Sequence, residues 1–201
     1  MRKADTDMEL GSNFELDLTQ SEYKKDNIFN YLNDYYTVYT DSGRSAIRLL
    51  NKVLKKGTIL LPDYICESVL DIYKNDYKIC FYKINRDMTI DIDDLQSKMD
   101  SQVTVVYLMH YFGSVQNHKV LKYLEATKKE CGNTIIEDTT HSIFTKERTI
   151  GDYCVCSLRK WFPVADGGVL YTKKNVTDIW DMAEYRKNYF VDSLEAMILK
   201  K

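Results

Sequence analysis

The stretch GDYCVCSLRKWFPVADGGVLYT, residues 151–172, places two short apolar runs on either side of a polar loop. The runs YCVCSL and GGVLYT have the length and pattern of buried β-strands. Between them lies one lysine, Lys160, in a loop that ends in Asp166-Gly167-Gly168. In a tight loop between buried strands a lysine is partly desolvated, which favours its neutral, nucleophilic amine. The stretch alone leaves two readings open: a nucleophilic lysine, or a loop lysine that faces water.

Outward from this stretch, strand-like and helix-like segments alternate along the chain. Strand patterns cover residues 35–40, 58–62, 78–84, 102–110, 133–138, 153–158 and 167–172, and helical patterns cover residues 41–56, 65–75, 91–99, 117–130 and 174–201. Strands separated by helices at this spacing are joined by right-handed crossovers into a largely parallel sheet covered on both faces. We therefore predict an α/β fold with three α/β/α layers and a mostly parallel, seven-stranded sheet.

The composition of the 201 residues argues against several other classes of protein. The net charge of −2 argues against a basic nucleic-acid surface, and no apolar run reaches membrane-spanning length. The acidic N-terminus, MRKADTDMELGSNFELDL, is unlike a signal peptide, so we expect a cytoplasmic protein. The five cysteines form no CxxC pair, which predicts reduced thiols and no metal site.

Five loops are the natural places for a ligand site. In open parallel sheets, ligands bind at the carboxyl ends of the strands. That rule selects residues 41–46, 62–66, 110–113, 138–141 and 157–160, where most of the unusual polar residues of the chain occur. We expect the functional site to be built from these loops.

Two of these loops carry groups that suit a phosphorylated cofactor. In TDSGRSAIRLL a helix is predicted directly after a strand, so the free amides at its N-terminus could bind an anion together with Arg44 and Ser45. The same residues are also typical of a plain turn with a helix cap, which is the alternative. In NTIIEDTTHS an apolar strand ends in Glu137 and Asp138, one of which should point into the space above the sheet. A surface pair is the alternative there, and a lone histidine such as His141 is more often structural than catalytic.

Together these groups match the needs of pyridoxal 5′-phosphate (PLP). The cofactor requires a lysine for its aldehyde, a carboxylate for its protonated ring nitrogen and an anion pocket for its phosphate. The motifs SGRSAI, LPDYICESV, MHYFGS, IIEDTTHS and SLRKWFPVADGG resemble, in order and spacing, the DegT/DnrJ/EryC1/StrS family of PLP-dependent sugar aminotransferases. The resemblance covers about residues 37–172 and implies the type I aminotransferase fold, with the large domain of that fold in this chain.

The resemblance also implies a role for each candidate residue. Lys160 would bind the cofactor covalently and shuttle the proton, Asp138 would pair with the pyridine nitrogen, and His141 would lie near the phenolic oxygen. The implied phosphate contacts are Arg44, Ser45 and Ser157. Asp166-Gly167-Gly168 stands where the family commonly has Glu-Gly-Gly.

Three departures from the family pattern affect these expectations. Ser157 precedes Lys160 by three residues, where most members have a serine five residues before the lysine. The position of the aromatic residue that usually stacks on the cofactor corresponds to Cys66, with Tyr64 nearby. Family members are longer, so we expect an N-terminal segment (1–35), a PLP-binding large domain (36–175) and a helix (176–201) that leads towards a missing small domain.

The function implied by the resemblance is transamination of a keto sugar in polysaccharide or natural-product glycan biosynthesis. The substrate would be nucleotide-linked, the amino donor would be an amino acid, and the protein would be a homodimer that binds neither nucleic acid nor membrane. The alternative is a truncated, non-catalytic remnant of the fold, or one half of a split enzyme. A third reading, a nucleotide-binding α/β protein that uses DSGRSA, lacks the glycine-rich patterns of that class.

Overall fold

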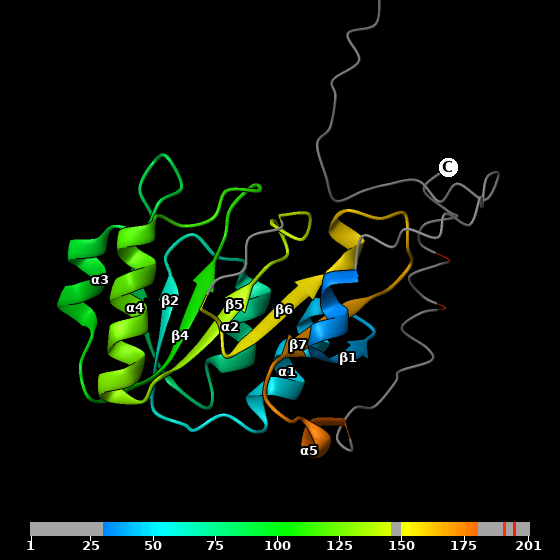
Figure 1. The fold of residues 1–201 in the computed structure, drawn as a ribbon, viewed down its shortest axis with the longest axis horizontal. Helices are drawn as coiled ribbons and strands as arrows, with labels where there is room; N and C mark the ends of the chain where they lie inside the picture. The colour runs from blue at the N-terminus through cyan, green and yellow to red at the C-terminus, as the bar shows by residue number, and fades with distance from the viewer. Residues whose placement is uncertain (1–29, 146–149, 181–190, 192–194, 196–201) are drawn as a thin grey trace, which may run out of the picture.

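The computed structural model describes residues 30–145, 150–180, 191 and 195 of the chain, and one seven-stranded sheet runs through them (Figure 1). The strands are β1 (Tyr36–Thr40), β2 (Thr58–Pro62), β3 (Lys78–Tyr82), β4 (Val103–Met109), β5 (Thr134–Asp138), β6 (Tyr153–Ser157) and β7 (Gly168–Thr172). The α-helices are α1 (Gly43–Asn51), α2 (Glu67–Tyr73), α3 (Ile92–Lys98), α4 (His118–Cys131) and α5 (Thr177–Trp180). Two short 3₁₀ segments are η1 (Asn30–Asp34) and η2 (Leu158–Lys160).

The predicted fold class is confirmed, and each predicted strand is present within its predicted bounds. Helices α1, α2 and α3 are shorter than the predicted segments, whereas α4 has the predicted length, shifted by one residue. Helix α1 ends at Asn51 and turn residues follow it, although the helical pattern continues to residue 56. Of the predicted helix 174–201, residues 174–176 are not helical, and α5 begins at Thr177. Beyond α5 the structure describes only Val191 and Glu195, both helical, and the remainder lies outside the described residues. The division of the chain into three segments stays a prediction.

In the strand order, β1-β7-β6-β5-β4-β2-β3, one strand, β7, runs opposite to the other six. Strands β3, β2, β4, β5 and β6 pair in parallel, whereas β7 is antiparallel to both β6 and β1. The chain between β6 and β7, residues 158–167, contains the 3₁₀ segment η2 and no α-helix. It is shorter than the crossover of a dozen or more residues that parallel neighbours require. Lys160 therefore lies in a loop between adjacent antiparallel strands. It is exposed there, so the predicted desolvation of its amine is wrong for the chain without a ligand.

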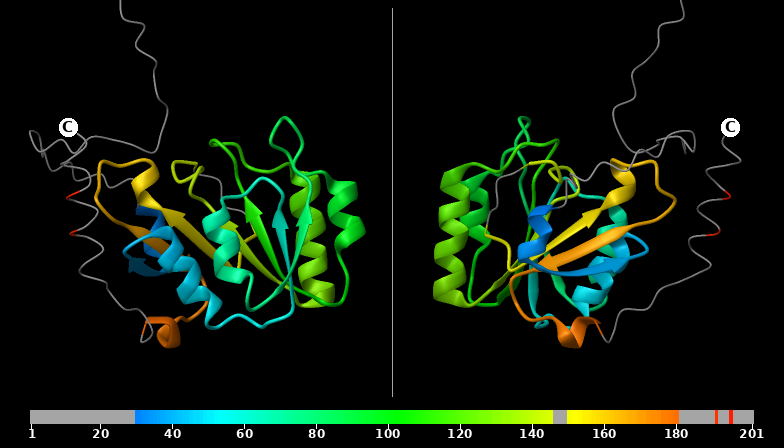
Figure 2. Two further views of the ribbon diagram at one scale, coloured as in Figure 1. Left: turned by 180° about the vertical axis from the view of Figure 1, so that it is seen from behind. Right: turned by 45° about the vertical axis from the view of Figure 1, so that its right-hand side comes forward.

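Helices cover both faces of the sheet, which gives the three layers (Figure 2). Helices α1 and α2 pack on one face, where Leu50 and Tyr73 meet Ile136 of β5 in one apolar cluster. Helices α3 and α4 pack on the other face, where Leu95 and Leu124 meet side chains of the central strands in a second cluster. Burial of these apolar surfaces is the main favourable contribution to the stability of such a sheet.

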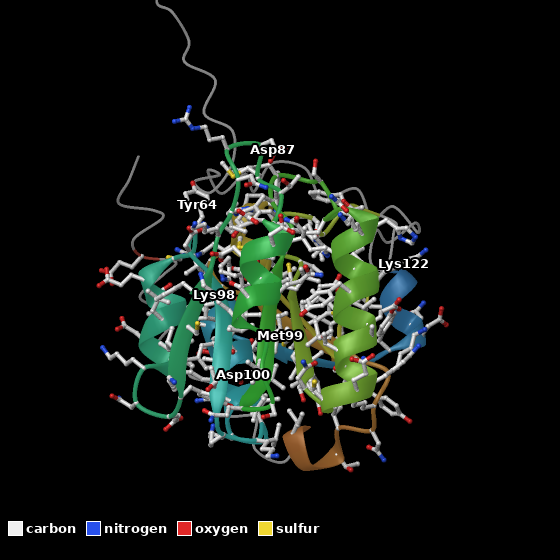
Figure 3. The ribbon with its side chains drawn as sticks, turned by 90° about the vertical axis from the view of Figure 1, so that its left-hand side faces the viewer. Tyr64, Asp87, Lys98, Met99, Asp100 and Lys122 are labelled. Carbon is white, nitrogen blue, oxygen red and sulfur yellow. The ribbon has the colours of Figure 1, made fainter. Side chains whose placement is uncertain are left out.

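The packing places the carboxyl ends of six strands at one edge of the sheet. Strand β1 runs in the same direction as β6, because both are antiparallel to β7. Tyr64, which follows β2, lies at this edge (Figure 3). No helix in the described part of the chain is long and apolar enough to cross a membrane.

Candidate functional site

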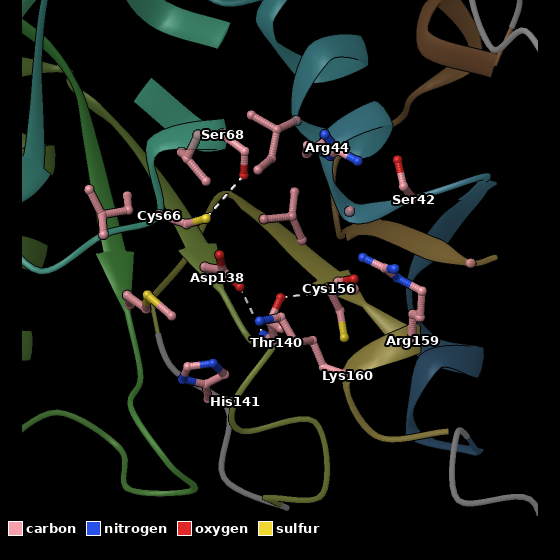
Figure 4. A pocket seen from close by; sticks show the side chains of 18 of the residues that line it. Ser42, Arg44, Cys66, Ser68, Asp138, Thr140, His141, Cys156, Arg159 and Lys160 are labelled. Atoms are coloured by element: carbon pink, nitrogen blue, oxygen red, sulfur yellow. Dashed lines mark hydrogen bonds between the residues drawn. The ribbon is translucent and has the colours of Figure 1, made fainter. Parts of the chain in front are cut away.

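A cavity of about 590 Å³ opens at the carboxyl edge of the sheet (Figure 4). This volume is within the range of small-molecule and cofactor sites. Its walls come from the loops after β1, β2, β4, β5 and β6, as the topology rule predicts. Six of the seven predicted site residues line it: Arg44, Cys66, Asp138, His141, Ser157 and Lys160.

The N-terminus of α1 forms one end of the cavity. Ser42 caps the helix, because its Oγ accepts a hydrogen bond of 3.2 Å from the backbone N–H of Ser45. A Cβ at Gly43 would lie 2.9 Å from Cβ of Ser157, so only glycine allows the helix to approach the end of β6 this closely. The predicted residue Ser45 does not line the cavity; its Oγ lies 3.1 Å from the Oγ of Ser42, which does.

Asp138 ends β5 in a buried position, with 6% of its surface exposed. Its Oδ1 accepts a hydrogen bond of 2.8 Å from the backbone N–H of Thr140, and its Oδ2 accepts one of 2.6 Å from the hydroxyl of Tyr107. The carboxylate thus has a donor on each oxygen while its residue still lines the cavity. Buried carboxylates need such donors, because an unpartnered charge is costly to bury.

Thr140 connects the loop that carries Asp138 to the loop that carries Lys160. Its Oγ1 accepts a hydrogen bond of 3.0 Å from the backbone N–H of Ser157, and its carbonyl oxygen accepts one from Nε1 of Trp161. The backbone N–H of Leu158 donates to the carbonyl of Gly167 at 3.0 Å, which closes the Lys160 loop. Residues that flank the lysine on both sides are therefore held against the rest of the site.

His141 lies in a half-buried position on the other wall. The ring of Phe112 stacks on it, with ring centroids 5.1 Å apart and planes 20° apart. Its Nδ1 atom is buried and has no hydrogen-bond partner among the described residues. Burial lowers the pKa of His141; the carboxylate of Asp138 acts to raise it, and the ammonium of Lys160 acts to lower it.

Both candidates for the ring-stacking position, Cys66 and Tyr64, line the cavity. Sγ of Cys66 lies 3.2 Å from Oγ of Ser68, and hydrogen bonds from the hydroxyl and the backbone of Ser68 lower the pKa of the Cys66 thiol. Tyr64 is 54% exposed, and its carbonyl accepts a hydrogen bond of 2.7 Å from the hydroxyl of Tyr111.

The sequence reading did not single out Arg159 or Thr140. Arg159 lines the cavity, and Figure 4 shows it with Ser42 and Arg44 at one end, while Cys66 and His141 lie towards the other. Arg159 lies in a loop that the carboxyl-edge rule selects, and its positive charge next to Lys160 is the feature of the sequence that indicates an anion site. Thr140 gave no such signal, because its role depends on a contact with a different loop. Among the described residues, no group of three or more His, Cys, Asp and Glu side chains could hold a metal ion.

In sequence, the similarity to known proteins is limited. No family model matches the chain, so the family named from the motifs stays a prediction. A Thermoplasma volcanium protein assigned as glycine dehydrogenase (decarboxylating) subunit 1 is 33% identical over 100 residues, which cover 47% of this chain and 23% of the relative.

In structure, the similarity extends over most of the chain. Spr1654 from Streptococcus pneumoniae, assigned as a sugar aminotransferase and solved in its PMP form, is 21% identical, with a TM-score of 0.64 over 82% of this chain and 47% of that one. PseC from Helicobacter pylori, an aminotransferase involved in the biosynthesis of pseudoaminic acid, is 15% identical, with a TM-score of 0.63 over 77% of this chain and 44% of that one. The chain thus spans less than half of these two structures. It has the α/β fold of the type I PLP-dependent transferases.

Proposed function

We propose that this chain is the PLP-binding part of an aminotransferase. One observation carries the proposal: Asp138, Lys160 and the N-terminus of α1 line the same cavity, although they come from three different loops. These are the carboxylate, the amine and the anion site that PLP requires. The fold shared with solved aminotransferases supports the proposal.

The residues of the cavity fit the cofactor group by group. Lys160 would bind the aldehyde, and Asp138 would hold the protonated ring nitrogen. The unpartnered Nδ1 of His141 has the chemistry to hydrogen-bond the phenolic oxygen. The phosphate would be bound at the N-terminus of α1 by backbone amides and by the cations Arg44 and Arg159.

When bound, PLP supplies an electron sink for a carbanion, and the protein positions the groups that move protons. Once the substrate amine has taken its place on PLP, the Lys160 amine would be free to act as the base. It would move the proton between a carbon of the substrate and a carbon of the cofactor. Asp138 would keep the proton on the ring nitrogen, because a carboxylate favours a neighbouring cation. The stacked ring of Phe112 would fix the plane of His141.

For the substrate, we propose a keto sugar, nucleotide-linked, with an amino acid as donor and a role in polysaccharide or natural-product glycan biosynthesis. The motif resemblance supports this choice, as does the structural similarity to Spr1654, assigned as a sugar aminotransferase. We propose a cytoplasmic homodimer on the same resemblance. The exposed rings of Tyr64 and Phe112, 54% and 62% accessible, suit coverage by a partner subunit.

The test is covalent trapping of PLP. Purified chain is mixed with PLP, its visible spectrum is recorded, and it is reduced with borohydride and mapped by mass spectrometry. We expect the adduct on the peptide that contains Lys160 and its loss in Lys160→Ala. Lys122→Ala is the matched control, because this exposed lysine lies on the outer side of α4 (Figure 3) and should leave the adduct unchanged. A folded wild-type chain without the adduct would overturn the proposal.

A second measurement separates an enzyme from a non-catalytic remnant. The PLP-loaded chain is mixed with amino acids such as glutamate, and conversion of the cofactor to its amine form is followed by absorbance. Conversion supports the transaminase. Trapping on Lys160 without conversion by any amino acid would favour the remnant or the split enzyme.

A further inference from the structure

The hydroxyl of Tyr107 donates a hydrogen bond of 2.6 Å to Oδ2 of Asp138. The two strands are in parallel register, with Met109 of β4 opposite Asp138 of β5. Tyr107 precedes Met109 by two residues, so it points to the same face of the sheet, the face that carries α1 and α2. Its hydroxyl reaches the carboxylate from within the core, because Tyr107 is buried and does not line the cavity, whereas Asp138 does.

The position of Tyr107 is fixed by its surroundings. The residue is fully buried, and its backbone carbonyl accepts a hydrogen bond of 2.7 Å from the hydroxyl of Tyr82. The ring of Tyr73 packs edge-on against it, with ring centroids 6.3 Å apart. A side chain held in this way cannot turn its hydroxyl to water, so the carboxylate is its hydrogen-bond partner whenever the chain is folded.

The direction of the hydrogen bond follows from the chemistry of the two groups. Burial raises the pKa of Tyr107 well above its ordinary value, and the nearby charge of Asp138 raises it further. Tyr107 therefore keeps its proton and acts as the donor. Together with the N–H of Thr140, it gives each carboxylate oxygen one donor and leaves further lone pairs for a group in the cavity.

We propose that Tyr107 is a positioning residue for the cofactor ring: its hydrogen bond to Oδ2 fixes the orientation of the Asp138 carboxylate, so that the remaining lone pairs of the carboxylate meet the protonated ring nitrogen. This inference rests on the proposed function. Two donors, one on each oxygen, hold the carboxylate in one orientation. A carboxylate held in this way favours a protonated ring nitrogen beside it, and a protonated ring is the stronger electron acceptor.

The test uses PLP labelled with ¹⁵N in its ring, bound to the whole chain, because the ¹⁵N chemical shift reports protonation of the ring nitrogen. In Tyr107→Phe we expect the shift to move from its wild-type value towards that of Asp138→Asn, the reference for a lost carboxylate. PLP should also bind more weakly, because the carboxylate that meets the ring nitrogen is less fixed in its position. In the Asp138→Asn background, Tyr107→Phe should have little further effect, because the partner charge is already gone.

Tyr82→Phe is the matched control. Tyr82 is equally buried, and its hydroxyl donates to the carbonyl of Tyr107 at 2.7 Å, not to a carboxylate. It should lower stability to a similar extent but leave the ¹⁵N shift at the wild-type value. If Tyr107→Phe does not fold, 3-fluorotyrosine at position 107 replaces it; this analogue is a stronger donor and should move the shift in the opposite direction.

The outcomes separate the two proposals. A wild-type chain that binds no PLP overturns both. Bound PLP with the same ¹⁵N shift in wild type and Tyr107→Phe, or the same change in Tyr82→Phe as in Tyr107→Phe, overturns the role of Tyr107 and leaves the proposed function standing.

Discussion

The backbone N–H of Ser157 donates a hydrogen bond of 3.0 Å to Oγ1 of Thr140. This bond joins the carboxyl ends of β5 and β6, which carry Asp138 and Lys160. Together with the pairing of β5 and β6, this bond helps to fix the relative position of Asp138 and Lys160. The two residues are 17 positions apart in the chain, but the strands that they follow or end are adjacent in the sheet.

Thr140→Val should weaken the site without unfolding the chain. Valine has nearly the same shape but no hydroxyl, so the N–H of Ser157 loses its acceptor at a cost of about 1 kcal/mol in the free energy of unfolding. The Lys160 loop should loosen and PLP affinity should fall several-fold. Urea titration and PLP titration measure the two effects. Thr140→Ser keeps the hydroxyl and should bind PLP nearly as wild type does; equal loss in both variants would contradict the role of this bond.

The pKa of His141 should respond in opposite directions to two substitutions. Burial holds this pKa below its ordinary value of 6.5, Asp138 raises it and Lys160 lowers it. Asp138→Asn should therefore lower the pKa further, and Lys160→Ala should raise it. NMR titration of the imidazole in the apo chain measures both, with His141→Gln to assign the resonance. Movement in the same direction in both variants would show that these charges do not act on His141.

The same shift predicts a pH dependence of stability. Because the pKa of His141 is lower in the folded chain, the unfolded chain binds more protons between the folded pKa and about 6.5. The contribution of this residue to stability is fully present above pH 6.5 and is lost as the pH falls towards the folded pKa. The difference in urea stability between wild type and His141→Gln, measured from pH 8 to pH 5, should show this decline; a flat difference would contradict it.

Cys66 should be the most reactive thiol among the cysteines that line the cavity or lie beneath it. Hydrogen bonds from Ser68 lower its pKa, whereas burial raises that of Cys156, so the thiolate is far more populated at Cys66. Iodoacetamide at neutral pH should label Cys66 before Cys156, as read by peptide mapping. Ser68→Ala should slow the labelling, and bound PLP should protect. Labelling that is insensitive to PLP would place Cys66 away from the cofactor.

Asp152→Asn should destabilise the chain at neutral pH. The buried carboxylate accepts a hydrogen bond of 2.9 Å from the N–H of Ile135 and lies 3.0 and 2.8 Å from Nζ of Lys128 and Lys174. Both lysines are partly exposed, so we expect a loss of about 1–2 kcal/mol in the free energy of unfolding. Asp71→Asn, which removes an exposed ion pair with Lys74, is the control and should have little effect.

The pH dependence at Asp152 has the opposite sign to that at His141. Burial acts to raise the pKa of this carboxyl, but the hydrogen bond from Ile135 and the two lysines outweigh burial and lower it. Its contribution to stability is therefore present above its ordinary pKa of 3.8 and is lost as the pH falls through the lower, folded value. The stability difference between wild type and Asp152→Asn should shrink in that range, and an unchanged difference at low pH would contradict the assignment.

Local patterns in the sequence predict the seven strands and six of the residues that line the cavity. Apolar runs such as TILLP and NTIIED form strands because their pattern is local, and the carboxyl-edge rule then selects the loops in which Asp138 and Lys160 lie. Six of the seven predicted residues line the cavity because each is the last residue of a strand or follows a strand within a few residues. Ser45 does not, because the cap geometry of α1 puts Ser42 in the wall instead.

The contacts that hold these loops in place join segments that are distant in the chain, so they are seen only in the tertiary structure. The placement of β4 beside β5 brings Tyr107 to Asp138 across 31 positions of the chain. In the same way, the placement of β5 beside β6 brings the hydroxyl of Thr140 to the backbone N–H of Ser157. Strand order and side-chain direction depend on packing between distant segments, and no local pattern of residues encodes them.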